Sequence, residues 1–459
     1  MDNFNTLALR SELKASLQRH GYTKPSEIQA RSLPLSLEGK DLVACAATGS
    51  GKTLAFALAL LNELEPVSSN PTRLILTPTR ELAEQIAKTI RQLAQTIPNV
   101  KVLTIYGATA VGYQRRSLEH GVDILIATPG RLMDLDRKGY LSLKEISQVV
   151  IDEADCMLDM GFFDDISFIL DGLPQDRQTL MFSATFDGQA RQLAESFMRE
   201  PSLVEVAKNE AHADISHRFI KVSSKNRDQA LANVLLSEWQ GPSLVFVNTQ
   251  AECARLEAML NESGFKAISI HGGMEQEARH QAWALFQAEC VHVLLATDVA
   301  ARGLDIKGLP LVIQYELNRS SEVYVHRSGR TGRADTKGLA LSFINPERES
   351  KNLSNALKAA SLPTNVKFEQ VPRVSRSTLP ELKYQLIKLD LGKKSKIRKG
   401  DILGALTREK VIDGKDVGVI SIHVFFSFVA IRGNKVKQAL NLLNNNPVKK
   451  RTVKARIVF

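Results

Sequence analysis

The segment 46–53, which reads Ala-Ala-Thr-Gly-Ser-Gly-Lys-Thr, carries the residues best suited to binding phosphate. It follows an apolar run at 42–45 and precedes an apolar stretch at 54–61, and this strand–loop–helix order is what a P-loop requires. Gly49 and Gly51 allow the backbone to turn successive N–H groups toward phosphate oxygens. The start of the following helix adds a favourable dipole for an anion. The spacing therefore predicts a nucleotide-binding loop.

Two carboxylates further along the chain supply what a phosphate-binding loop lacks for hydrolysis. Asp152 and Glu153 directly follow the apolar run at 149–151, so we expect them at the carboxyl end of a strand, where α/β sheets bind ligands. Lys52 is expected to reach the β- and γ-phosphates, while Thr53 and Asp152 are expected to bind Mg²⁺. Glu153 suits orientation or deprotonation of the attacking water. The loop residues expected to contact the nucleotide are Ala46, Ala47, Thr48, Gly49, Ser50, Gly51, Lys52 and Thr53.

The positive charge of the chain is concentrated near its carboxyl-terminal end. The 459 residues include 60 Lys and Arg against 50 Asp and Glu, a formal charge of +10. Residues 391–459 hold 16 of the basic residues and only four of the acidic ones, a balance of +12, which leaves −2 for residues 1–390. A basic module of this kind most often meets nucleic acid or an anionic membrane.

The remaining composition argues against several classes of protein. Hydrophobic residues make up 44% of the chain, enough for folded cores rather than disorder. No apolar run approaches the length of about 18 residues that a membrane-spanning helix needs, and the first residues do not resemble a signal peptide. The four cysteines form no C-x-x-C pair, so neither a zinc knuckle nor a disulfide framework is expected, and a reducing cytoplasm is favoured. They are Cys45, Cys156, Cys253 and Cys290.

Short apolar runs rich in Val, Ile and Leu alternate with helix-like stretches along most of the chain. Runs such as 74–77 and 244–247 are continuous rather than alternating, which is typical of strands buried on both faces. The alternation of strands and helices indicates an α/β fold with doubly wound parallel sheets. The pattern breaks near 201–214 and again across 345–380, and the rest reads as a third, smaller unit.

Residues 152–155, Asp-Glu-Ala-Asp, spell the box after which the DEAD-box RNA helicases are named, and the chain resembles this family. The segment 21–29, with Phe4 upstream, is similar to the family's Q motif, which implies that Gln29 binds adenine. A Gln amide can pair with both the N6 donor and the N7 acceptor of adenine, which guanine cannot match. The resemblance also implies that Tyr22 or Phe4 packs on the base.

The other helicase motifs occur in order, and the resemblance assigns each a role. By this resemblance RNA is contacted by Arg80, Thr128, Arg131, Gly272 and Thr297; Ser183 and Thr185 couple hydrolysis to strand separation; Gly303 and Asp305 face the nucleotide; and Arg330 and Arg333 are arginine fingers. An arginine finger neutralises charge on the transferring phosphoryl group, an effect worth about 10³–10⁵ in rate.

The resemblance covers residues 4–345 and implies two tandem RecA-like domains, at 1–208 and 209–345, that bind ATP, Mg²⁺ and RNA across their cleft. Residues 346–380 are expected to form a linker, and 381–459 a basic, RRM-like α+β domain that binds RNA. In this family, closure of the cleft bends one RNA strand and separates a short duplex locally. Hydrolysis and phosphate release then reopen the cleft.

The stretch 392–406 resembles the C-terminal RNA-binding domain of the bacterial DbpA subfamily. This resemblance implies a target in large-subunit (23S-type) ribosomal RNA, the hairpin near the peptidyl-transferase centre, with pre-ribosomal particles as partners and a role in large-subunit assembly. A general RNA chaperone, or an ATP-gated RNA clamp without ribosomal specificity, is the alternative, and the lysine run is alternatively a solvated linker. The basic side chains expected to reach phosphate are Lys393, Lys394, Lys396, Arg398 and Lys399.

Residues 424–431 partly match the aromatic strand motif of RRM domains, which would place Phe426 and Phe428 under stacked bases. A two-residue period suggests instead that these two side chains share one apolar face. The residues on that face would be Ile420, Ile422, Val424, Phe426, Phe428 and Ala430. We therefore favour core packing of Phe426 and Phe428, and base stacking stays open.

Overall fold

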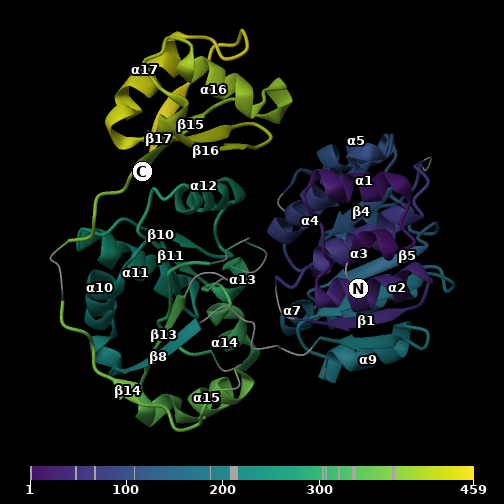
Figure 1. The fold of residues 1–459 in the computed structure, drawn as a ribbon, viewed down its shortest axis with the longest axis horizontal. Helices are drawn as coiled ribbons and strands as arrows, with labels where there is room; N and C mark the ends of the chain where they lie inside the picture. The colour runs from purple at the N-terminus through teal and green to yellow at the C-terminus, as the bar shows by residue number, and fades with distance from the viewer. Residues whose placement is uncertain are drawn as a thin grey trace. The chain divides into compact units, whose positions relative to one another are not determined.

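The chain divides into two compact units between residues 206 and 215. The first holds one seven-stranded sheet; the second holds another seven-stranded sheet and a four-stranded sheet (Figure 1). No helix in the described part of the chain is long and apolar enough to cross a membrane. The computed structural model describes residues 3–46, 49–66, 69–107, 109–186, 188–206, 215–301, 304, 306, 308–318, 321–332, 337–360, 362–374 and 378–459.

The sheet of the first unit, here called domain 1, is parallel throughout and has the order β3-β4-β2-β5-β6-β1-β7. Its strands are β1 (Leu42–Cys45), β2 (Arg73–Leu76), β3 (Val102–Ile105), β4 (Ile124–Ala127), β5 (Gln148–Asp152), β6 (Gln178–Ser183) and β7 (Ser202–Glu205). Its helices are α1 (Ser11–Arg19), α2 (Glu27–Leu37), α3 (Lys52–Asn62), α4 (Arg80–Leu93), α5 (Val111–Glu119), α6 (Pro129–Arg137), α7 (Ala154–Asp159), α8 (Phe163–Asp171) and α9 (Gly188–Phe197). This confirms the doubly wound α/β fold that the sequence predicts.

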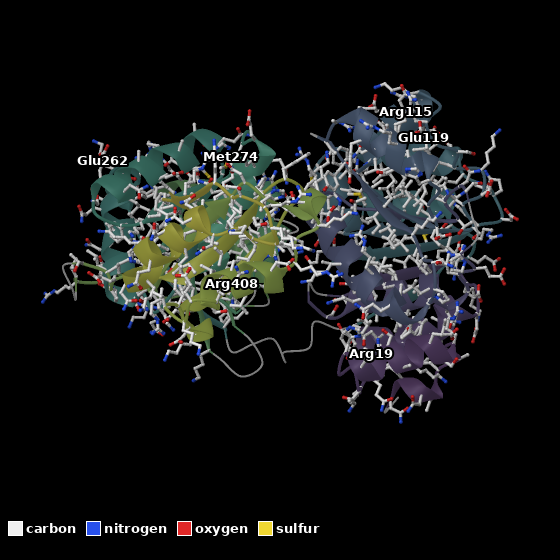
Figure 2. All side chains as sticks on the ribbon, turned by 90° about the horizontal axis from the view of Figure 1, so that it is seen from above. Arg19, Arg115, Glu119, Glu262, Met274 and Arg408 are labelled. Carbon is white, nitrogen blue, oxygen red and sulfur yellow. The ribbon has the colours of Figure 1, made fainter. Side chains whose placement is uncertain are left out.

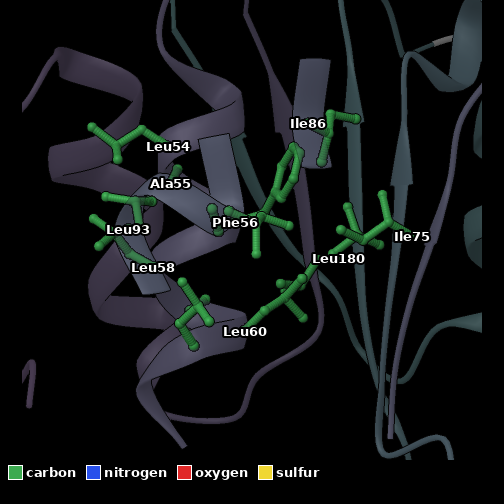
Figure 3. Packing of buried hydrophobic residues seen from close by; sticks show 14 of the residues in the cluster. Leu54, Ala55, Phe56, Leu58, Leu60, Ile75, Ile86, Leu93 and Leu180 are labelled. Carbon is green, nitrogen blue, oxygen red and sulfur yellow. The ribbon is translucent and has the colours of Figure 1, made fainter. Parts of the chain in front are cut away.

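Helices cover both faces of this sheet, which is why its strands read as continuous apolar runs. Residues of β1 alternate between two hydrophobic clusters, one formed with α1–α4 and one with α6–α9. In the first cluster, Phe56 of α3 packs against Phe182 of β6 with ring centroids 5.3 Å apart, and Figure 3 shows Phe56 beside Leu180 and Ile75 of the strands. The packed α3 fixes the position of the loop that precedes it.

The larger sheet of the second unit and the helices around it are here called domain 2. This sheet is also parallel and has the order β10-β11-β9-β12-β13-β8-β14. Its strands are β8 (Ile215–Lys221), β9 (Ser243–Phe246), β10 (Ala267–Ile270), β11 (Val293–Ala296), β12 (Leu311–Gln314), β13 (Gly338–Ile344) and β14 (Phe368–Glu369). Its helices are α10 (Arg227–Glu238), α11 (Gln250–Glu262), α12 (Gln276–Gln287), α13 (Asp298–Ala301), α14 (Ser321–Ser328) and α15 (Pro346–Ala359). The alternation of apolar runs and helix-like stretches in both halves of the sequence thus reflects two similar parallel sheets.

The segment 346–380, predicted to be a linker, contributes two elements to domain 2. Leu353 and Leu357 of α15 are buried against Phe219 and Tyr324, and β14 pairs in parallel with β8. The prolines and polar residues that suggest a linker lie between and after these elements, and the described residues there, 360, 362–367 and those from 370 to 380, lack helix and strand. The sequence pattern gives little sign that α15 packs on domain 2, because only Leu353, Ala356 and Leu357 of this helix are buried.

The four-stranded sheet forms the C-terminal domain. It is antiparallel, with the order β16-β17-β15-β18 and two helices packed on one face. Its elements are β15 (Tyr384–Leu389), α16 (Lys399–Thr407), β16 (Val417–Ile422), β17 (Ser427–Arg432), α17 (Val436–Asn445) and β18 (Ala455–Val458). This β-α-β-β-α-β order is the one expected for an RRM-like domain.

The predicted apolar face of residues 420–430 is wrong because a turn interrupts the two-residue period. Residues 423–426 connect β16 to β17, and Ile420 pairs with Val429 while Ser421 pairs with Phe428. Ile420 and Val429 belong to the core beneath the helices, whereas Phe428 is on the opposite sheet face. Phe428 is fully buried there, so it is covered by protein but lies outside the domain core.

The Phe426 ring also lies outside the core of the C-terminal domain and contacts other side chains. Its ring lies 5.3 Å from that of Phe428 and 6.2 Å from that of His280 in α12. Lys388 of β15 stands over the Phe426 ring at 5.0 Å and forms an ion pair with Glu277 of α12. Residues of α12 therefore contact the sheet face that carries Phe426 and Phe428. The prediction that Phe426 packs in the core is wrong.

Candidate nucleotide and RNA sites

The described residues of the loop before α3 place a glycine and a lysine at the start of that helix. Gly51 has φ of +98°, a left-handed conformation that favours glycine. Lys52 is 8% exposed, and its Nζ donates hydrogen bonds to the carbonyl oxygens of Ala46 at 2.7 Å and Ser183 at 3.2 Å. The Ser50 hydroxyl is buried without a hydrogen-bond partner among the described residues. The ammonium group and this hydroxyl thus come from the loop at which an anion would bind.

The start of α2 is tied to this loop. The Gln29 Nε2 donates to the carbonyl oxygen of Gly51 at 3.0 Å, and its Oε1 accepts from the Ser26 N–H at 2.9 Å. The Ser26 hydroxyl donates to the carbonyl oxygen of Ser50 at 2.7 Å. A methyl group on Gly51 would overlap the Gln29 amide. Sequence reasoning placed Gln29 near adenine, and the structure adds that its amide holds the loop.

The two aromatic residues proposed for base stacking have opposite environments. Phe4 is 3% exposed and belongs to the hydrophobic core of domain 1, whereas Tyr22 is 41% exposed. A base can stack only on an accessible ring, so the burial of Phe4 argues against that part of the prediction. Tyr22 stays the candidate.

The carboxylate of Asp152 is buried at the end of β5. It is 3% exposed, and burial together with the neighbouring Glu153 carboxylate raises the pKa of Asp152 to about 7. Asp152 Oδ1 accepts a hydrogen bond from the Glu153 N–H at 3.0 Å. Glu153 itself has φ of +53°, a conformation that non-glycine residues adopt rarely and that clusters at functional sites.

The acidic box is joined to the end of the neighbouring strand β6. The Ser183 hydroxyl accepts from the Asp155 N–H at 3.2 Å, and the Asp155 carboxylate accepts from the Ala184 N–H at 3.2 Å. Ser183 is fully buried and Thr185 is half-buried. Hydrogen bonds therefore join residues 183–184 to the acidic box.

Two helix starts in domain 1 carry the residues expected to meet RNA. Arg80 opens α4 after β2, and Thr128 is the N-cap residue of α6 after β4. Because β2 and β4 are hydrogen-bonded neighbours, both helices begin at the same edge of the sheet. Arg131 is half-buried and donates to the carbonyl oxygen of Thr109 at 2.8 Å and to Gln114 Oε1 at 2.7 Å. Its side chain is engaged in fixing the local fold.

A buried arginine that sequence reasoning passed over organises domain 2. Arg327 is 1% exposed and bonds Asp298 through two nitrogens at 2.6 and 2.8 Å. It also donates to Asn248 Oδ1 at 2.8 Å and lies over the Phe246 ring at 5.2 Å. Phe246 ends β9, Asn248 follows β9 and Asp298 follows β11, so this side chain joins the ends of two strands to α14. The sequence does show Arg327 in the segment 326–333, but only Arg330 and Arg333 of that segment were assigned a role.

The remaining predicted site residues lie partly inside and partly outside the residues that the structure describes. Thr297 and Arg330 are each 8% exposed, and Gly272 is exposed. The Thr297 N–H donates to the carbonyl oxygen of Ile270 at 3.4 Å, which joins the ends of β10 and β11. Ala47, Thr48, Gly303, Asp305 and Arg333 lie outside the residues that the structure describes.

The basic segment of the C-terminal domain precedes α16 and presents its charge to solvent. The side chains of Lys393, Lys394, Lys396, Arg398 and Lys399 are all exposed. Ile397 between them is buried, and Asp401 accepts a hydrogen bond from the Arg398 N–H at 2.7 Å. The segment is therefore an ordered part of the domain, and the solvated-linker reading is wrong.

Comparison with known families divides the chain as the structure does. Residues 26–193 match the DEAD/DEAH box helicase family, residues 226–335 the helicase conserved C-terminal domain, and residues 387–457 the DbpA RNA binding domain. The chain is 40% identical to the ATP-dependent RNA helicase DbpA of Escherichia coli (strain K12) over 100% of both chains. It is 34% identical to the protein of that name from Bacillus subtilis (strain 168) over 99% of both.

A solved structure gives the same result. S. cerevisiae Dbp5 bound to RNA and ADP BeF3 has a TM-score of 0.72 and 29% identity, covering 81% of this chain and 96% of that one. Fold and family matches together define the class as DEAD-box ATP-dependent RNA helicases. Since the match to DbpA helicases runs over the full length and includes their RNA-binding domain, the chain belongs to the DbpA family.

Proposed function

We propose that this DbpA-type helicase acts on large-subunit ribosomal RNA, and that its C-terminal domain delivers the two sheet domains to that RNA in pre-ribosomal particles of the cytoplasm. The single observation that carries the proposal is the exposed basic segment 393–399 in a domain that matches the DbpA RNA binding domain. Lysine and arginine side chains held on a folded domain can bind phosphates in a fixed register. Such a domain is suited to choosing one RNA structure for the rest of the enzyme.

For the chemical step, we assign binding of the β- and γ-phosphates to Lys52 and positioning of the attacking water to Glu153. The left-handed backbone at Glu153 supports this role, because such conformations of non-glycine residues cluster at functional sites. Arg330 and Arg333 are assigned as arginine fingers. Lys52 belongs to the first unit and Arg330 to the second, so hydrolysis in this proposal requires the two units to close on one ATP.

The residues proposed to hold Mg²⁺ have the right chemistry. Thr53 and Asp152 offer hard oxygen ligands, and Mg²⁺ prefers such ligands together with phosphate oxygens and water. A divalent ion would also favour the ionised form of Asp152, whose pKa is raised in the protein alone. Bound there, Mg²⁺ would neutralise charge on the phosphates.

Coupling between ATP and RNA is assigned to Ser183 and Thr185. The hydrogen bonds between Ser183, Asp155 and Ala184 support this role, since they join the acidic box to the next strand end. The proposed RNA contacts are Arg80, Thr128, Gly272 and Thr297, with Arg131 supporting the same edge of domain 1 from within.

The alternative is a general RNA chaperone or an ATP-gated clamp without ribosomal specificity. The basic segment alone would serve that role equally well, because phosphate contacts carry no sequence information. The full-length similarity to DbpA helicases favours the specific proposal.

The test compares ATPase stimulation of the full chain by fragments of large-subunit ribosomal RNA with stimulation by unrelated RNAs of equal length. The proposal expects one fragment, containing the hairpin near the peptidyl-transferase centre, to stimulate at a concentration at least about tenfold lower than the others. A chain ending at residue 380 should lose this preference. Equal stimulation by all RNAs before and after truncation would establish the chaperone instead.

A further inference from the structure

The turn between β16 and β17 exposes an aromatic ring that neither the core nor the proposed function uses. Phe425 is 62% exposed, more than any other large hydrophobic side chain in the described residues. Val424 beside it is 37% exposed. Phe425 lies at the tip of the hairpin and gains no burial in the core, so its ring is available for a contact with a ligand.

The basic segment is fastened to this tip by its backbone. The Lys393 N–H donates to the carbonyl oxygen of His423 at 2.7 Å, and the Lys394 N–H donates to that of Val424 at 3.0 Å. Gly392 makes the approach possible, because a methyl group there would overlap the carbonyl groups of His423 and Val424. Phe425 and the first lysines of the segment 393–399 therefore form one surface, here called the tip platform.

The tip platform combines an accessible ring face with cations. The Nζ of Lys394 lies 4.4 Å from the centroid of Phe425, a cation–π contact that holds the lysine beside the ring. Lys393, Lys396 and Arg398 are exposed on the same segment. An aromatic face next to positive charge is the pattern by which proteins hold single-stranded nucleic acid, where a base stacks on the ring and its phosphates meet the cations.

We propose that Phe425 stacks on one unpaired RNA base while the adjacent lysines bind that nucleotide's phosphates. A protein partner would need a larger apolar area than one ring and a valine, and the dense positive charge favours a polyanion. This inference rests on the proposed RNA binding by segment 393–399 and adds a base contact to it. It assigns to the C-terminal domain recognition of a loop or bulge rather than of a continuous duplex.

The experiment uses the full chain and a stem-loop of the ribosomal hairpin carrying 2-aminopurine at one loop position at a time. An unrelated stem-loop with the same label is bound in parallel. Phe425→Ala and Phe425→Trp are compared with the unchanged chain, and Val419→Ala is the matched control because Val419 is 45% exposed on the neighbouring strand β16. Thermal unfolding verifies that each variant folds.

Stacking predicts quenched 2-aminopurine fluorescence at one position, a loss of affinity of roughly 5- to 150-fold in Phe425→Ala, and retained affinity in Phe425→Trp. The slope of log affinity against log salt should stay unchanged in Phe425→Ala, because no phosphate contact is removed. Val419→Ala should bind as the unchanged chain does.

Two results would overturn the proposal. One is unchanged affinity and quenching in Phe425→Ala while the unchanged chain still prefers the ribosomal hairpin. The other is loss of binding to vesicles of phosphatidylcholine and phosphatidylserine in Phe425→Ala with RNA binding intact, which would make the tip platform a membrane contact. If both stem-loops bind equally but both lose affinity in Phe425→Ala, the stacking stands and only the ribosomal target fails.

Discussion

Gln29 donates a hydrogen bond from its side-chain amide to the main-chain carbonyl oxygen of Gly51 at 3.0 Å, and this bond joins the start of α2 to the loop before α3. Since the same amide accepts a hydrogen bond from the Ser26 N–H, the Gln29 side chain joins the backbone at Ser26 to Gly51, which is 22 residues beyond Gln29 along the chain. A change at either end should therefore alter the whole nucleotide site.

Gly51→Ala should impair ATP binding through this bond. The added methyl would overlap the Gln29 amide and would also sit at φ of +98°, so we expect a loss of stability of about 1–3 kcal/mol and at least a tenfold rise in the Kd of a fluorescent ATP analogue. Gly39→Ala is the matched control, because Gly39 has φ of +75° but nothing within 4 Å of the added methyl. Equal effects of the two substitutions would show that backbone strain alone, and no overlap with Gln29, is responsible.

Asp152→Asn should change how stability depends on pH. With the pKa of Asp152 near 7 in the folded protein and 3.8 as its ordinary value, the folded chain keeps a proton between these values that the unfolded chain releases. The free energy of unfolding of the unchanged chain therefore falls as pH rises from about 4 to 7.

Asparagine carries no such proton. In buffer free of nucleotide and metal, Asp152→Asn should be close in stability to the unchanged chain near pH 4 and more stable above pH 7, by up to about 4 kcal/mol. Melting temperatures measured from pH 4 to 8 check this. Parallel curves for the two proteins would refute the raised pKa.

Glu153→Gln should separate binding from turnover. The amide keeps the size of the side chain but cannot accept the proton of the attacking water, so kcat for RNA-stimulated ATP hydrolysis should fall at least about 100-fold. Affinity for ATP and RNA should change less than about threefold. Multiple-turnover phosphate release at an undiminished rate would exclude Glu153 from the assigned role.

Arg327→Gln should unfold domain 2 more easily. The substitution breaks the pair with Asp298 and leaves that carboxylate unpaired against a buried site, which typically costs about 3–5 kcal/mol. Arg115→Ala is the control, because the ion pair of Arg115 with Glu119 is exposed on α5, where both residues are labelled in Figure 2. Thermal unfolding should show a large shift for the first variant and none for the second.

Gly392→Ala should separate the basic segment from the β16–β17 turn. The methyl would meet the backbone carbonyls of His423 and Val424, which cannot move aside as a flexible side chain can. We expect RNA affinity to fall at least about fivefold, with Gly400→Ala as the control because nothing lies within 4 Å of its added methyl. Equal RNA binding by both variants would mean that the segment works without the turn.

The doubly wound sheets were predictable from the sequence because their strands are buried on both faces and so read as apolar runs. The phosphate loop and the acidic box were predictable for a different reason, since each is a short local motif. Gly51 and Asp152 could be assigned from their immediate neighbours in the sequence. Both motifs can be recognised from consecutive residues, without knowledge of their contacts to distant parts of the chain.

The interactions that could not be predicted join distant parts of the chain. Nothing in the sequence indicates that Arg327 meets Asp298, 29 residues away, or that Gln29 meets Gly51. The face of Phe428 was missed because the turn at 423–426 shifts the two-residue period, and a shift of one residue moves a side chain to the other face. A turn inside an apolar run leaves no local signal of its own.

The Arg327–Asp298 pair has a consequence for genetics. Because one buried ion pair joins segments assigned separately to ATP and to RNA, mutant alleles in this region should not sort into two phenotypic groups. An allele isolated for defective RNA handling should also hydrolyse ATP poorly. Second-site suppressors of such an allele should map to the partner segment rather than to the ligand contacts.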